Sequence, residues 1–357
     1  MKTFSFRFIL ATSVIALAAS CSIEDPDKNS PLMPDITKEV NSTANIPTSD
    51  IIGIKDVNAL EIGEDGTFQL VSDSEPAKTE IDFDKSGDRS ATISDIVVDF
   101  ADIELPIVDE MSDYAFDGQS LIVFINNPFE EEIEYSAEIK ADGRSAQLPA
   151  TKVPAGKTAL VFEPVATAGT VAGYNTKHIA TPEIRTILAK IPAEPVTLSN
   201  QKVKSSTVII KASTDTRASR SLEISAKVVF KFSFQPQSRI AFRFYLDKLI
   251  TSEVVESVKA RNVSAEVTCE STLPFTFDIS GYKADGNKII SLEPSIKGNE
   301  KTNSVISVSP WHSWEEANGA TLIITLINDT NATLSLTKDQ AIKLITNNVT
   351  ITDLKIL

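Results

Sequence analysis

The chain has 357 residues, of which 34 are Lys or Arg and 49 are Asp or Glu, so its formal net charge is −15 at pH 7. A chain this acidic repels phosphate and anionic lipid headgroups, which excludes nucleic acid as a partner and argues against electrostatic binding to a membrane surface. The length is large for a single core and suits two domains.

The first twenty-one residues have the order of a secretory signal. Lys2 and Arg7 supply the positive start, and a mainly apolar run of twelve residues follows from Phe8 to Ala19. A membrane-spanning helix needs about 20 apolar residues, so this run is too short to be one. Ala18, Ala19 and Ser20 then lead to Cys21, which predicts a signal peptide over residues 1–20 and a lipidation site at Cys21.

This ending resembles the lipobox of bacterial lipoproteins, although Leu17 stands one position earlier than the usual leucine. The resemblance implies a diacylglycerol thioether on Cys21 and an amine acylated by a chain such as palmitate, which together give a stable anchor. The next residues, Ser22 to Asp27, look like the acidic signal that displays Bacteroidota lipoproteins on the outer leaflet of the outer membrane. We therefore expect the protein to face the cell exterior. The alternative is that these acidic residues form an ordinary solvated tail.

Composition divides the remaining chain. Residues 21–49 are rich in Asp, Asn, Ser, Thr and Pro and predict a flexible acidic stalk. We expect one β-sandwich domain over residues 50–165, a connecting segment with a short helix over 166–195, and a second β-sandwich over 196–357.

Alternating apolar residues dominate the sequence after the stalk. The longest alternation runs from Leu222 to Phe234, and Ile240 to Leu246 repeats it after a Gln-Pro-Gln break, which predicts an antiparallel hairpin. Further strands are expected at Ile51–Leu60, Thr67–Val71, Ile93–Phe100, Leu121–Asn126, Ile133–Lys140, Ala159–Phe162, Thr207–Ala212, Val305–Val308, Thr321–Ile327, Thr333–Leu336 and Val349–Thr352.

Two further features bear on the core. Thr181 and Pro182 can begin a helix whose apolar stripe, Ile184, Ile187, Leu188 and Ile191, ends at Pro192. Cys269 follows Val263, Ala265 and Val267 in strict alternation, so we expect its thiol to point into the core.

A partial repeat links the two halves. Asn127-Pro128-Phe129 and Lys140 to Gly143 in the first half correspond to Leu273-Pro274-Phe275 and Lys283 to Gly286 in the second. With the ending after Leu336, these segments resemble uncharacterised Bacteroidota surface lipoproteins with tandem immunoglobulin-like β-sandwich domains. A fainter likeness, over Ile125 to Pro164, is to the water-stress type of immunoglobulin-like sandwich. The resemblance implies an all-β fold of two β-sandwich (immunoglobulin-like) domains with a short connecting helix, and it brings no activity.

One segment has the spacing of a cation loop. Asp82, Asp84, Ser86 and Asp88 place oxygen ligands at alternate positions before and after Gly87, as in a calcium loop. Position twelve is Ile93, where a bidentate Glu would be expected. The two interpretations are a calcium site and a solvated acidic turn, and no other cofactor is predicted.

A second segment carries both tryptophans. Trp311, His312 and Trp314 follow Pro310, and exposed indoles can stack on sugar rings, which predicts a glycan site. The alternative is a loop whose indoles close one end of a sandwich, because Trp is usually mostly buried.

No catalytic motif accompanies these segments. Glu130, Glu131, Glu132 and Glu134 are adjacent acids that split between faces, and His178 has no Cys or Asp at short spacing. We therefore expect a non-catalytic cell-surface lipoprotein with a binding, adhesion or envelope-structural role, whose partner is an envelope protein or a glycan. The alternative is a glycan-binding accessory protein of a carbohydrate-uptake system.

Overall fold

The structure is a computed structural model. It describes residues 36–52, 60–84, 90–97, 111–112, 114–209, 217–246, 258–259, 262–308, 320–352 and 355–356. Strands dominate these residues, and the two helices among them, α2 (Thr48–Ile52) and α3 (Glu183–Ile187), are short. The all-β prediction is confirmed. The chain forms two compact units, one of residues 1–55, 108–114 and 234–357 and the other of residues 56–107 and 115–233. We call them the terminal unit and the inserted unit.

The inserted unit is a β-sandwich of two sheets. Its seven-stranded sheet has the order β12, β11, β7, β14, β3, β2, with β4 also paired to β14. These strands are β12 (Asn175–Ala180), β11 (Gly156–Glu163), β7 (Gln119–Asn127), β14 (Arg217–Lys231), β3 (Phe68–Asp73), β2 (Leu60–Ile62) and β4 (Ala77–Asp84). Its five-stranded sheet comprises β10 (Thr151–Val153), β8 (Ile133–Ala141), β13 (Thr197–Ile209), β5 (Ser90–Val97) and β9 (Arg144–Gln147).

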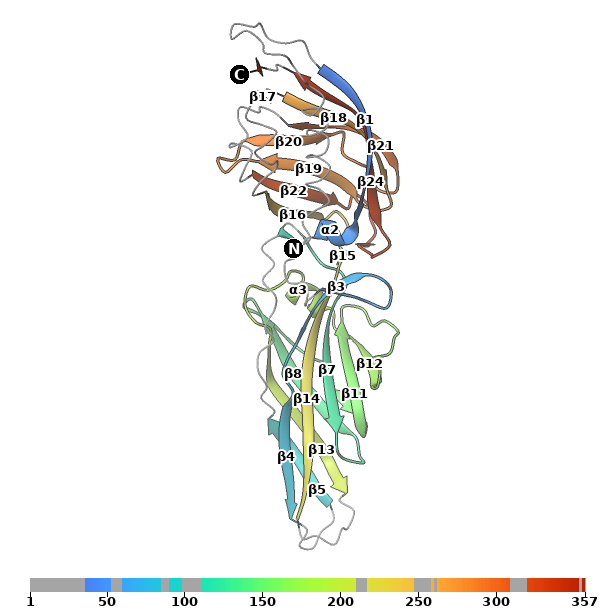
Figure 1. Ribbon diagram of the computed structural model, residues 1–357. Coiled ribbons are helices and arrows are strands. Elements are labelled where there is room, and N and C mark those ends of the chain that lie inside the picture. The colour runs from blue at the N-terminus through green and yellow to red at the C-terminus, as the bar shows by residue number, and fades with distance from the viewer. Residues whose placement is uncertain are drawn as a thin grey trace. The chain divides into compact units, whose positions relative to one another are not determined.

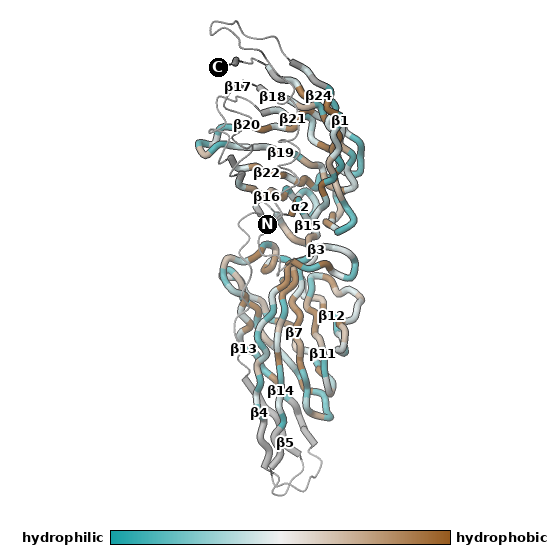
Figure 2. The backbone as a smooth tube through the Cα atoms, viewed as in Figure 1, coloured by the Kyte–Doolittle hydropathy of each residue, from teal (hydrophilic) through white to brown (hydrophobic). Residues whose placement is uncertain are grey.

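Alternation explains how this sandwich forms its core. Every second residue of β7 and of β8 is buried, so each sheet turns one apolar face inward. In Figure 2, hydrophobic residues colour much of β7 and β11 brown, while the connecting turns are mostly teal. The Asp142-Gly143 turn joins β8 to β9 with φ of 47° and 71°, the left-handed backbone that such a tight hairpin requires.

The terminal unit is built on one nine-stranded sheet. Its order is β1, β24, β18, β21, β20, β19, β22, β16, β6, and Figure 1 shows the sheet curving, with β1 and β24 steep and β19, β20 and β22 nearly horizontal in the view. The strands are β1 (Ile36–Pro47), β24 (Ala341–Thr352), β18 (Asn262–Ser271), β21 (Lys301–Val308), β20 (Lys288–Glu293), β19 (Thr276–Tyr282), β22 (Ala320–Ile327), β16 (Arg239–Leu246) and β6 (Met111–Ser112). Two two-stranded sheets stand apart from the larger sheets: β15 (Ser233–Phe234) with β23 (Leu334–Ser335), and β17 (Val258–Lys259) with β25 (Lys355–Ile356).

The predicted stalk is partly wrong, because its second half contains a strand. β1 pairs antiparallel with β24 from Ile36 opposite Ile351 to Pro47 opposite Ala341, with one bulge. An edge strand with one buried face needs few apolar residues, so its Ser, Thr and Asn content resembled that of a linker. The helix α2 follows at once and buries Ile51 and Ile52 completely, where the sequence predicted a strand.

The predicted hairpin is also wrong. β14 pairs with β3, β4 and β7, whereas β16 pairs with β22 and β6. Alternation identifies the buried face of a strand and carries no information about its neighbours. As a result, the units do not follow the predicted division at residues 166–195: residues 196–233 belong to the inserted unit, and the amino-terminal strand joins the carboxy-terminal half.

The predicted helix is confirmed in part. α3 covers Glu183–Ile187 and buries Ile184 and Ile187, with Leu188 buried directly after it. The Thr181 side chain does not cap this helix, since its hydroxyl donates to the Ile179 carbonyl and the N-cap position is Pro182.

Candidate functional site

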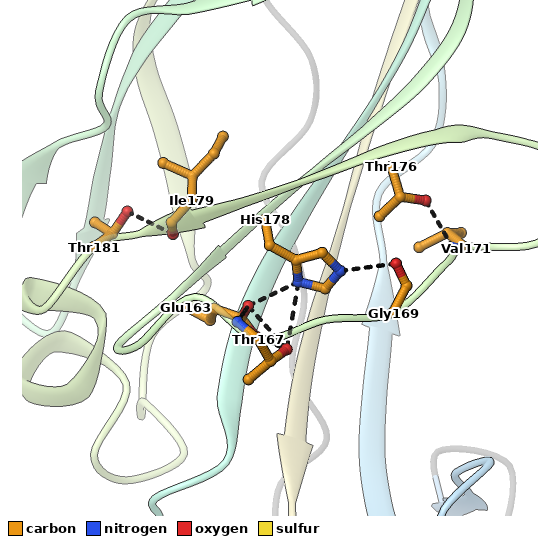
Figure 3. A network of polar contacts seen from close by, with 8 residues as sticks. All are labelled: Glu163, Thr167, Gly169, Val171, Thr176, His178, Ile179 and Thr181. Atoms are coloured by element: carbon orange, nitrogen blue, oxygen red, sulfur yellow. Dashed lines mark hydrogen bonds and ion pairs between the residues drawn. The ribbon is translucent and has the colours of Figure 1, made fainter.

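Among the described residues of the inserted unit, the closest approach to a catalytic arrangement lies where β11 and β12 run parallel. Phe162 pairs with Ile179 in this register, and residues 164–174 carry the chain back between the two strands. Parallel strands require such a crossover, and this one is short. Glu163 ends β11 and His178 lies in β12, so the register brings their side chains to the same end of the pair (Figure 3).

The Glu163 carboxylate is the centre of the network. Its Oε1 atom lies 2.7 Å from His178 Nδ1 and accepts the Thr167 backbone N–H at 2.6 Å. The Thr167 hydroxyl donates to the same carboxylate at 3.0 to 3.1 Å. The Glu163 carbonyl accepts the Thr181 N–H at 2.7 Å, so both the side chain and the main chain of Glu163 are engaged.

His178 uses both ring nitrogens. Nδ1 faces the Glu163 carboxylate, and Nε2 lies 3.2 Å from the carbonyl oxygen of Gly169. A carbonyl and an ionised carboxylate only accept hydrogen bonds, so both contacts are hydrogen bonds when both nitrogens carry a proton. The side chains of His178 and Glu163 are 18% and 12% exposed, so their contact lies largely out of water.

Two contacts extend the network along the loop. The Val171 N–H donates to the Thr176 hydroxyl at 2.8 Å, and the Tyr174 ring packs on Phe124 with centroids 4.9 Å apart. We call Glu163, Thr167, Gly169 and His178 the loop clasp, because their bonds join the loop 164–174 to both strands.

The clasp has the residue types of an acid–base pair without the geometry of one. A general base needs a ring nitrogen that faces the substrate, and a nucleophile needs a base within hydrogen-bond reach. Here Nε2 is bonded to a main-chain carbonyl, and the Thr167 hydroxyl donates to Glu163. The arrangement therefore fixes a loop. Sequence reasoning set His178 aside because no Cys or Asp lay nearby, and its partner is a Glu fifteen residues away at the end of the preceding strand.

The predicted calcium ligands are only partly described. Asp82 and Asp84 lie in β4, where their backbones pair with Ser219 and Arg217, while Ser86 and Asp88 lie outside the described residues. Across the described ranges, no group of three or more His, Cys, Asp or Glu side chains could hold a metal ion. The calcium site stays a prediction.

The other predicted site residues, Cys21, Trp311, His312 and Trp314, also lie outside the residues that the structure describes. The lipidation and the glycan loop therefore stay predictions. In the part of the chain that is described, no helix is long and apolar enough to cross a membrane.

The acidic run and the core cysteine are described. Glu132 pairs with Lys152 at 3.8 Å and Glu134 with Lys204 at 2.7 Å, so these carboxylates bind cross-strand lysines and do not converge. Cys269 is fully buried in β18, as predicted, and burial raises the pKa of its thiol to about 12. A neutral, inaccessible thiol is a core residue.

No protein-family model and no curated protein matches this chain. Among solved structures, it is similar to "a putative secreted protein from Parabacteroides distasonis ATCC 8503", with 10% identity and a TM-score of 0.48 over 89% of this chain and 99% of that one. The PBSX exported protein XepA is 11% identical, with a TM-score of 0.16 over 74% of this chain and 86% of that one. Similarity at this level carries no argument about function.

Proposed function

We propose that this protein is an exported lipoprotein, held in the outer membrane by acyl chains on Cys21 and displayed at the cell exterior, with a non-catalytic role in binding, adhesion or envelope structure. The observation that carries the proposal is the order of the first twenty-one residues: a positive start, a short apolar run and small residues before a cysteine.

The position of the first strand supports the proposal. Fourteen residues separate Cys21 from Ile36, where β1 begins. Fully extended, they span at most about 50 Å, since each residue adds about 3.5 Å. In this proposal the anchor connects to the terminal unit through β1.

The loop clasp supports a non-catalytic role. Of the residues described in the inserted unit, His178 and Glu163 come closest to a catalytic pair, and their other hydrogen bonds go to a main-chain carbonyl, a main-chain N–H and a hydroxyl of the same loop. Removal of the pair is therefore expected to alter the loop.

Metabolic labelling tests the location. Cells grown with radiolabelled palmitate should yield a labelled protein that fractionates with the outer membrane and is degraded when intact cells are treated with protease. Cys21→Ser should lose the label and leave the membrane fraction. An unlabelled wild-type protein, or a serine variant bound as firmly as the wild type, would contradict the proposal.

The second candidate function is glycan binding in a carbohydrate-uptake system. It is favoured by the two tryptophans of the Trp311 to Trp314 segment in the sequence, and by Tyr245, whose side chain is 63% exposed in β16. Titrating glycans against tryptophan fluorescence tests the predicted Trp segment, and Trp311→Ala with Trp314→Ala should abolish any response that arises there.

A further inference from the structure

Strand β11 of the inserted unit is buried on both of its faces. Residues 158–163 of β11 are all buried, whereas in its neighbour β7 buried residues alternate with half-exposed ones. Val161 pairs with Ile122, which lies on the half-exposed face of β7, so both belong to the outward face of the sheet. Val161 is nevertheless only 5% exposed, and Ala159, two residues earlier on the same face, is fully buried. The second sheet packs on the inward face, so these two residues have another cover.

The loop between β11 and β12 provides this cover. Tyr174, at the end of the loop, packs on Phe124 with ring centroids 4.9 Å apart. Phe124 pairs with Ala159, which places it on the outward face. The Val171 N–H donates to the hydroxyl of Thr176, which pairs with Ala159 from the other side. The loop therefore lies over the outward face of β7, β11 and β12.

His178 holds the loop on this face through two acceptors. It pairs with Val161, so its ring lies on the outward face as well. Nδ1 is 2.7 Å from the Glu163 carboxylate, and Nε2 is 3.2 Å from the Gly169 carbonyl oxygen (Figure 3). Since both oxygens only accept while the carboxylate is ionised, both contacts are hydrogen bonds only when each ring nitrogen carries a proton. In a neutral ring, one nitrogen turns a lone pair toward an acceptor oxygen, and that hydrogen bond is lost.

The hydrogen bond to Gly169 is the one that a neutral ring gives up. The Glu163 carboxylate is the charged and the closer acceptor, so the remaining proton stays on Nδ1. Glu163 also accepts the N–H and the hydroxyl of Thr167, and these bonds do not involve the ring. Loss of the second proton therefore frees the loop at Gly169 and leaves Thr167 bound.

Glu163 is the charged group in contact with the ring among the residues that the structure describes. Neither the loop nor β7 contains Asp, Glu, Lys or Arg, and the titratable side chain of the loop is that of Tyr174. Lys177, on the opposite face of β12, donates from Nζ to the Lys152 carbonyl at 2.6 Å. The other charged side chains of the outward face lie further along β11 or on β14, three strands from β12: Lys157, Glu223 and Lys227. The charge of the ring is thus balanced by Glu163.

We propose that the loop between β11 and β12 is a pH-controlled cover of the outward face. It is closed while His178 carries two protons, and its segment 169–174 lifts off the sheet when the ring becomes neutral. Histidine is the side chain whose charge ordinarily changes between about pH 5 and 8, so the cover closes at the acidic end of this range and opens at the alkaline end. Opening exposes the apolar side chains of Ala159, Val161 and Phe124. The inference goes beyond the proposed function and does not depend on the lipid anchor.

Hydrogen exchange of the full chain, followed by mass spectrometry, tests the cover. The protein is labelled at about pH 5.5 and about pH 8.5, at either end of the histidine range, for times scaled to the intrinsic exchange rate at each pH. We expect the amides of residues 169–174, including the bonded Val171 N–H, to lose about tenfold in protection at the higher pH, the size of one lost hydrogen bond to a charged group. Peptides from β7 and β8 should keep their protection.

Two matched substitutions separate the two nitrogens of the ring. In His178→Gln, the amide nitrogen reaches the position of Nε2 and can still donate to Gly169, so the cover should stay closed at both pH values. In His178→Asn, the amide nitrogen reaches only the position of Nδ1 and can donate to Glu163, so segment 169–174 should be weakly protected at both. His312→Gln, which changes the other histidine of the chain, should keep the wild-type response.

Three results would overturn the inference. The first is equal protection of the wild-type loop at the two pH values, and the second is a pH response that survives in both His178 variants. The third is a loss of protection across the whole inserted unit, which would assign the response to unfolding of the domain. Labelling of Cys21 is independent of all three, so the proposed location can fail or hold separately.

Discussion

Replacing Ile46 by alanine tests whether residues 36–47 are a strand of the terminal unit or the flexible stalk that their composition suggests. Ile46 is 3% exposed and pairs with the fully buried Ile342. The substitution removes three buried carbons, worth about 2.4 kcal/mol at about 0.8 kcal/mol each. The cavity left behind adds to this, so we expect the free energy of unfolding to fall by about 2.5 to 4 kcal/mol.

Urea unfolding followed by tryptophan fluorescence provides the assay, because both tryptophans belong to the chain range of the terminal unit. With a slope of about 2 kcal/mol per molar urea, the midpoint should fall by about 1.2 to 2 M. Thr43→Ala is the matched control, since Thr43 is an exposed residue of the same strand and its loss should cost less than about 0.5 kcal/mol. Equal midpoints for the two variants would refute the assignment of β1.

Three further predictions concern the core and the clasp. With the other cysteine replaced by serine, Cys269 should resist a thiol reagent at pH 8 in the folded protein and react on unfolding, because burial raises its pKa to about 12; rapid labelling of the folded protein would contradict this. Burial raises the pKa of Tyr135 far above its ordinary value of 10.0, so its neutral form stabilises the fold below pH 10, and stability should fall above pH 10 as the unfolded state loses the proton. Tyr135→Phe should lose about 1 to 3 kcal/mol at pH 7, since the hydroxyl bonds to Gln201, and should have a flatter slope between pH 10 and 11 by circular dichroism; equal slopes would exclude this cause. Glu163→Ala should open the loop 164–174 and accelerate chymotrypsin cleavage after Tyr174, with the rest of the digest unchanged; an unaltered cleavage rate would show that the clasp does not hold the loop.

The strands with a clear alternation could be predicted from the sequence. β7, β8 and β22 lie where period-two patterns place them, because one buried face imposes the pattern directly on the residues. β1 could not be predicted, because a segment with its polar composition can form either an edge strand or a linker. Pairing could not be predicted either, because β14 and β16 carry similar patterns and bind different neighbours.

The candidate sites depend on register, which explains why the sequence alone did not find them. Glu163 and His178 meet because β11 and β12 are parallel, and the sequence of neither strand indicates that the two pair in this orientation. The turns at Asp142-Gly143 and Asp285-Gly286 could be predicted from the sequence, because a tight turn depends on the residues within it and not on distant partners.

The bond between Thr37 and Thr350 joins residues 313 positions apart, which sets the order in which a chain synthesised from its amino end can acquire structure. Residues 56–233 hold all strand partners of β14 and have emerged long before β24 does. β1 is synthesised first and cannot pair until its partner β24 has been made. During that delay its free edge is exposed to other chains, and slow closure of so distant a contact is the expected kinetic bottleneck.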